Sequence, residues 1–95
     1  MNAPEFTRAE LIEISDAISH ELDHYLDSGD PERHEKQYGT LTLLHEAQAK
    51  ILPVAFNFTL DDTTWGHERV QRISDLRRKM GLPEKPTAAE RSGWR

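Results

Sequence analysis

The strongest constraint on the fold is the spacing of apolar residues in the first third of the chain. They recur every three or four positions, the period of one helix face, at Leu11, Ile14, Ile18, Leu22, Tyr25 and Leu26. Thr7 and Glu10 fit a capping box at the start of this segment, and Gly29 suits the left-handed position after its end. The pattern predicts a helix over residues 7–28.

A second helix is predicted over residues 31–52. Asp30 is placed to cap it, Pro31 is tolerated in its first turn, and Pro53 marks its end. Its apolar arc is broad, which indicates contact on two sides and a central place in the fold. Gly39 in the interior costs roughly 1 kcal/mol relative to alanine, so we expect a kink there or a close approach of another chain segment.

Residues 54–60 alternate between apolar and polar, which is the period of a strand. Two interpretations stay open. The segment is an extended connector that presses Phe56 and Phe58 into the core, which we favour, or its edge pairs with another chain, for instance in a homodimer.

A third helix is predicted over residues 62–80, capped by Asp61 and ended by Gly81. Residues 83–95 have the composition of a flexible tail. Trp94 is the one large apolar residue in that tail, and we expect it to anchor the tail either on the domain or on a partner.

The predicted architecture is therefore all-α: an antiparallel helical hairpin (7–28 and 31–52) closed by the third helix, with residues 1–82 as one domain. The chain has 95 residues and is 36% hydrophobic, so its core is small and a partner or a second copy is expected to add stability. Cysteine is absent, which excludes disulfides and thiol chemistry. No leader or membrane segment is recognisable, and we expect a soluble cytoplasmic protein.

Charge is distributed unevenly between the two halves. Residues 1–48 hold eleven acidic and three basic residues, a net charge of −8, and residues 49–95 hold nine basic and six acidic residues, a net charge of +3. This polarity indicates either an electrostatic partner or mutual neutralisation of the halves within one fold.

Residues 20–24 spell His-Glu-Leu-Asp-His, the pattern that places two zinc ligands and a general base on one helix of metallopeptidases. On a helical wheel, however, His20 and His24 lie opposite the apolar stripe and among acids. Asp23 stands where such enzymes carry an uncharged residue, and no third histidine follows at the extended spacing. We favour a solvated surface helix; a zinc-dependent hydrolase built on His20, Glu21 and His24 is the alternative.

A weaker form of metal binding also stays open. Asp16, His20 and His24 step by four residues along one face, with Asp27 three further on. Side chains so placed could hold zinc or nickel weakly, for example between two molecules. No cofactor is assigned.

Polar residues on the buried arc of the second helix are a further feature. His34, His45 and Gln48 fall on or near that arc, where they are expected to form a buried polar network or to face a partner.

The third helix is rich in basic residues: Arg69, Arg72, Arg77, Arg78 and Lys79. The stem of Arg69 is expected to pack and its head to pair with an acid or a partner. Nucleic-acid binding through this helix is an alternative function. It is less favoured because the whole chain is acidic and an extended segment, rather than a short turn, precedes the helix.

The opening Thr7-Arg8-Ala9-Glu10-Leu11-Ile12 with Asp16-Ala17-Ile18, followed by an acidic turn and a second helix, resembles the small helical-hairpin proteins common in phage and prophage genomes. The resemblance covers about residues 6–52. It implies an accessory protein that binds a host component, as an inhibitor or adaptor, without catalysis.

The sequence thus predicts a non-enzymatic protein that acts by binding another protein or a second copy of itself. The predicted contact residues are Glu13, Asp16, His20, Asp23, Asp27, Phe56, Phe58, Arg69, Arg77 and Trp94.

Overall fold

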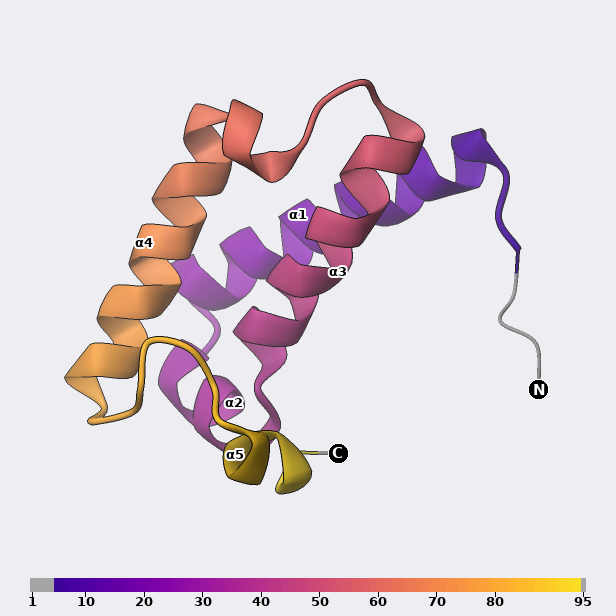
Figure 1. Ribbon diagram of the computed structural model, residues 1–95. Helices are drawn as coiled ribbons and strands as arrows, with labels where there is room; N and C mark the ends of the chain where they lie inside the picture. Colours follow the sequence, from indigo (N-terminus) through magenta and orange to yellow (C-terminus); the bar gives the residue numbers. More distant parts are fainter. Residues whose placement is uncertain (1–4, 95) are drawn as a thin grey trace.

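The computed structural model describes residues 5–94 and is all-helical over that range, without a strand. Residues 1–4 and 95, which belong to the predicted domain and tail, lie outside the described residues. The elements follow in the order α1 (Arg8–Asp27), α2 (Pro31–Tyr38), α3 (Thr40–Ala55), a 3₁₀ turn η1 (Leu60–Asp62), α4 (Thr64–Lys79) and α5 (Ala88–Ser92), shown in Figure 1. The predicted all-α class is confirmed. No helix among residues 5–94 is both long and apolar enough to cross a lipid bilayer.

Helix α1 begins with the capping box that the sequence predicts. The backbone N–H of Glu10 donates to Thr7 Oγ1 (3.1 Å), and the backbone N–H of Thr7 donates to Glu10 Oε1 (2.8 Å). These bonds satisfy two amide donors that the first turn would otherwise leave unpaired. They also lower the pKa of the Glu10 carboxyl, because they favour its charged form.

The predicted helix over residues 31–52 is two helices, and Gly39 separates them. Gly39 has φ = 64°, in the left-handed region, where it ends α2 and begins α3. A Cβ atom at this position would also overlap the indole ring of Trp94. The kink and the close approach that the sequence left as alternatives therefore both occur at this residue.

Helix α3 also ends later than predicted. It continues through Pro53 to Ala55, and the N–H of Phe56 closes the last turn on the carbonyl of Leu52 (2.8 Å). A proline interrupts a helix by removing one N–H donor and by crowding the turn before it. Pro53 lies in the final turn, so only Val54 and Ala55 follow it in the helix.

Residues 54–60 form no strand in the described chain, and Phe56 and Phe58 are only partly buried and lie outside the apolar core. Val54 and Ala55 still belong to α3, and Leu60 opens the 3₁₀ turn. The rings of Phe56 and Phe58 stack on each other, with centroids 5.2 Å apart. Alternation over so few residues arose from a loop that buries both rings in part, not from a pleated backbone.

Helix α4 begins two residues later than predicted, and Thr63 rather than Asp61 caps it. The Thr63 hydroxyl accepts from the N–H of Gly66 (3.0 Å). The neighbouring Asp62 caps the 3₁₀ turn instead, since its carboxylate accepts from the N–H of Thr59 (2.9 Å).

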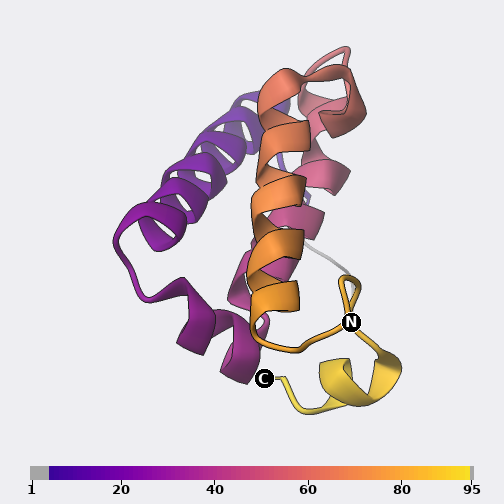
Figure 2. The same ribbon diagram turned by 90° about the vertical axis from the view of Figure 1, so that its left-hand side faces the viewer.

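The core lies where α1, α3 and α4 meet. Ile18 and Leu22 of α1, Leu41 of α3 and Ile73 of α4 form its buried centre. Figures 1 and 2 show α1 packed behind α3, with α4 beside both. At one end of the molecule, Arg8 near the start of α1 donates to the carbonyl of Ala55 at the end of α3 (2.8 Å).

Residues 83–94, predicted as a flexible tail, pack back on the domain. They lead into α5, which Figure 1 shows beside α2 and the first turn of α3. Trp94 lies against Gly39, and the Arg91 guanidinium pairs with Glu46 of α3 (2.6 Å). Of the two predicted roles for Trp94, anchoring on the domain is the one observed.

Replacing Gly39 with alanine should destabilise the protein more than replacing Gly81. Both glycines have positive φ, where alanine costs about 1–2 kcal/mol, but a Cβ at Gly81 meets no atom within 4 Å. Gly39→Ala must in addition displace Trp94. Urea denaturation of the two variants measures the difference; equal losses of unfolding free energy would show that Trp94 does not pack on Gly39.

Candidate functional site

Ion pairs between the two halves of the chain neutralise much of the charge asymmetry. Five of them join an acid from residues 1–48 to a base from residues 49–95: Asp23–Arg69, Asp27–Arg72, Glu35–Arg77, Glu32–Lys79 and Glu46–Arg91. Neutralisation within the fold was one of the two interpretations of the sequence. The structure supports it for these acids and for the bases of α4.

Glu35 and Arg77 form the one ion pair among residues 5–94 in which both side chains are fully buried. Arg77 Nη1 lies 2.6 Å from Glu35 Oε2, and both side chains have 0% exposure. The second nitrogen of the guanidinium reaches Glu90 of α5 (2.6 Å), while its Nε donates to the carbonyl of Pro83 (2.7 Å). We call Glu35, Arg77 and Glu90 the buried ionic cluster.

Glu35 has a second function in this cluster. Its carboxylate accepts hydrogen bonds from the backbone N–H of Thr42 (3.0 Å) and from the Thr42 hydroxyl. Thr42 lies in the first turn of α3, where amide donors lack helical partners and the helix dipole favours a negative charge. One carboxylate of α2 thus caps α3 and binds α4.

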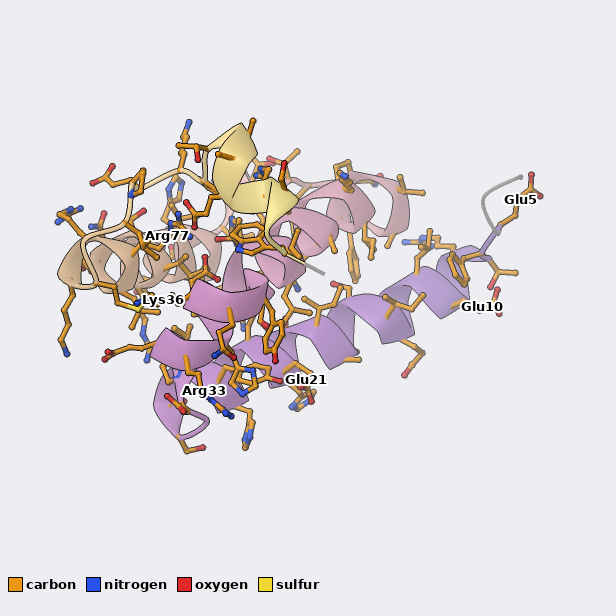
Figure 3. All side chains as sticks on the ribbon, turned by 90° about the horizontal axis from the view of Figure 1, so that it is seen from below. Glu5, Glu10, Glu21, Arg33, Lys36 and Arg77 are labelled. Carbon is orange, nitrogen blue, oxygen red and sulfur yellow. The ribbon has the colours of Figure 1, made fainter. Side chains whose placement is uncertain are left out.

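The prediction that Arg77 contacts a partner is therefore wrong. Its guanidinium is fully buried where α2, α4 and α5 meet, whereas Arg33 and Lys36, labelled in Figure 3, are exposed on α2. Burial disfavours the charged guanidinium, but hydrogen bonds to Glu90 and Glu35 outweigh this effect and raise the pKa of Arg77.

Arg69 and Asp23, both predicted contact residues, bind each other. Arg69 Nη2 lies 3.1 Å from Asp23 Oδ1, and its other terminal nitrogen donates to Gln48 Oε1 (3.2 Å). The guanidinium also lies 5.0 Å from the centroid of the Trp65 ring, a distance typical of a cation–π contact. The packed stem and paired head predicted for Arg69 are both present.

Gln48 forms the polar network predicted beneath the acidic helix. Its amide nitrogen donates to the hydroxyls of Ser19 (2.7 Å) and Ser15 (3.2 Å) of α1. Together with Arg69, this side chain joins all three long helices through the core. His34 takes no part; its ring packs instead against Tyr25, with centroids 4.7 Å apart.

His20 and His24 are exposed on the outer face of α1, as the helical wheel predicts. No three His, Cys, Asp or Glu side chains within residues 5–94 lie close enough to hold a metal ion. A zinc site of the metallopeptidase kind requires a third protein ligand and a shielded water. The residues around His20 and His24 supply neither.

The outer face of α1 keeps charges that the fold does not use. Glu13, Asp16 and Glu21 are exposed and, within the described part of the chain, take part in no ion pair or side-chain hydrogen bond. His20 lies among them. We call these four residues the unpaired acidic face; Glu21 is labelled in Figure 3. Asp27, also a predicted contact residue, pairs with Arg72 at an exposed position (3.0 Å).

His45 is a half-buried residue of a different kind. Its Nδ1 atom is shielded from solvent and has no hydrogen-bond partner within residues 5–94. Burial lowers the pKa of the ring, and the positive charge of Arg69 lowers it further, against the smaller opposing effects of Glu46 and Asp61. The ring is therefore neutral near pH 7.

Removing the charge of Arg77 should cost far more stability than removing the charge of the adjacent Arg78. Arg77→Met leaves the buried Glu35 carboxylate uncompensated, a loss of about 3–5 kcal/mol. Arg78 forms exposed pairs with Glu84 and Asp75, so Arg78→Met should cost at most about 1 kcal/mol. Equal unfolding free energies for the two variants would contradict the buried ionic cluster.

The protein should lose stability on acidification partly through His45. Below the ordinary histidine pKa of about 6.5, the unfolded chain binds a proton at this position that the folded state resists. The free energy of unfolding therefore falls as the pH drops from about 6.5 to the lowered pKa of His45. His45→Phe should lose less unfolding free energy than the parent protein between pH 7 and pH 5. Parallel pH–stability curves would show that His45 is not perturbed.

Comparison with known proteins adds no relative from which to transfer a role: no family model, no curated protein and no solved structure matches this chain. The candidate site is therefore inferred from the residues of this chain alone.

Proposed function

We propose that the protein acts without catalysis, by binding another protein through the unpaired acidic face of α1. The observation that carries the proposal is the exposure of Glu13, Asp16 and Glu21 without an internal partner on one face of α1, whereas Asp23 and Asp27 of the same helix pair with bases of α4. A surface of one charge sign favours a partner of the opposite sign and accelerates its association.

The partner fitted to this face is a protein with a basic surface, such as the phosphate-binding groove of a nucleic-acid enzyme. Helix α1 is twenty residues long, about 30 Å at 1.5 Å per residue, and its outer face can lie along such a groove. The resemblance of this chain to phage helical-hairpin proteins favours a component of the host cell as the target, with this protein as inhibitor or adaptor.

Nucleic acid is a less favoured partner because α4 has few free basic residues. Arg69, Arg72 and Arg77 each bind an acid of the first half of the chain, and Lys79 and Arg78 lie next to Glu32 and Glu84. Phosphate contacts would have to replace these pairs, which reduces the net gain from counterion release.

A charge-reversal experiment tests the proposal. Glu13→Lys/Asp16→Lys alters the unpaired acidic face, and Asp61→Lys/Glu68→Lys makes the same change in net charge at exposed positions outside it. Proteins captured from the native host by the parent chain at low salt, and released at about 0.5 M salt, should be lost with the first variant and retained with the second.

Circular dichroism should show both variants folded, since all four positions are exposed. Capture of the same proteins by both variants, or loss of capture in both, would exclude the face of α1 as the binding surface.

A further inference from the structure

A cavity of about 340 Å³ lies between α3, α4 and the segment that precedes α5. Figure 1 shows α3, α4 and the segment that precedes α5, with α1 behind α3. Val70, Ile73 and Pro86 supply an apolar lining. Val70 keeps 44% of its surface exposed, so the cavity can be reached from solvent. Its volume falls within the range of about 300–1,000 Å³ typical of small-molecule sites.

The charges around the cavity leave one basic group free. Glu46 pairs with Arg91 (2.6 Å), and Glu84 pairs with Arg78 (2.6 Å). Lys85 also lines the cavity, is exposed, and forms no ion pair with any of residues 5–94. A negatively charged group is therefore the complement that this lining lacks.

Two neutral polar side chains complete the lining. Ser74 of α4 is half-buried, and its hydroxyl makes no hydrogen bond within the described part of the chain. The ring of His45 forms part of the wall. In contrast, Thr42 already donates its hydroxyl to Glu35. Ser74 is thus a donor available to an acceptor on a bound molecule.

We propose that this cavity binds a small monocarboxylate with an apolar body. The apolar body lies against Val70, Ile73 and Pro86, and the carboxylate meets the Lys85 ammonium and accepts from the Ser74 hydroxyl. The site is separate from the acidic face of α1 and does not depend on the function proposed for that face.

The test uses 4-phenylbutyrate as the probe and neutral 4-phenylbutyramide as the matched ligand without charge. In ¹H–¹⁵N NMR titrations of the full chain, the amides of Val70, Ile73, Ser74 and Lys85 should shift. The carboxylate should bind about two- to fivefold more tightly than the amide, the gain typical of an exposed ion pair.

Variants separate this site from unspecific attraction. Lys85→Gln should reduce carboxylate binding to the level of the amide, whereas Lys50→Gln, which removes an exposed charge of α3 outside the cavity, should leave it unchanged. Val70→Asp puts a carboxylate into the apolar lining at an exposed position and should abolish binding of both ligands.

Three results would overturn the proposal: no shift at the lining residues, equal affinity for acid and amide, or equal loss in the Lys85 and Lys50 variants. Should Val70→Asp fail to fold, the comparison of Lys85→Gln with Lys50→Gln still decides the question.

Discussion

The buried carboxylate of Glu35 is the group on which most of this structure depends. A charge removed from water must regain its lost solvation through hydrogen bonds and an opposite charge. Glu35 obtains both, from the first turn of α3 and from Arg77 of α4. Arg77 in turn binds Glu90 of α5. Four segments of the chain are thereby joined at one point, in a protein whose apolar core is small.

The same principle explains which charges remain unpaired on the surface of the protein. A sequence with an acidic first half and a basic second half could have formed a strongly dipolar molecule. Instead, the bases of α4 are paired with acids of α1, α2 and the tail segment. Among the acids without an ion pair in residues 5–94 are those that α1 turns away from the core, around His20. The metallopeptidase-like string thus lies on an exposed charged face of α1, without the third ligand of a zinc site in residues 5–94.

Some local signals in the sequence predicted local structure well, but others did not: Asp30 rather than Gly29 takes the left-handed conformation and its side chain makes no capping bond, and Thr63 rather than Asp61 caps α4. The Thr7–Glu10 capping box, the apolar stripe of α1 and the outward position of His20 and His24 depend on neighbours within a few residues. The sequence predicted a kink or a close approach at Gly39, but the residue that approaches it, Trp94, lies at the far end of the chain and could not be identified from local spacing. A continuous helix would place Glu35 about 120° from Leu41 on the wheel, outside the buried arc. The ionic cluster was therefore missed.

We infer that the buried guanidinium of Arg77 holds the tail to the domain. The ¹⁵N heteronuclear NOE of the backbone amides of residues 88–93 tests this inference directly. In the parent protein these amides should be as rigid as those of α4. In Glu90→Gln, which weakens the bond to Arg77 without uncapping α3, they should become mobile while α1 and α3 stay rigid. Mobile amides in the parent protein, or an unchanged tail in Glu90→Gln, would contradict this account.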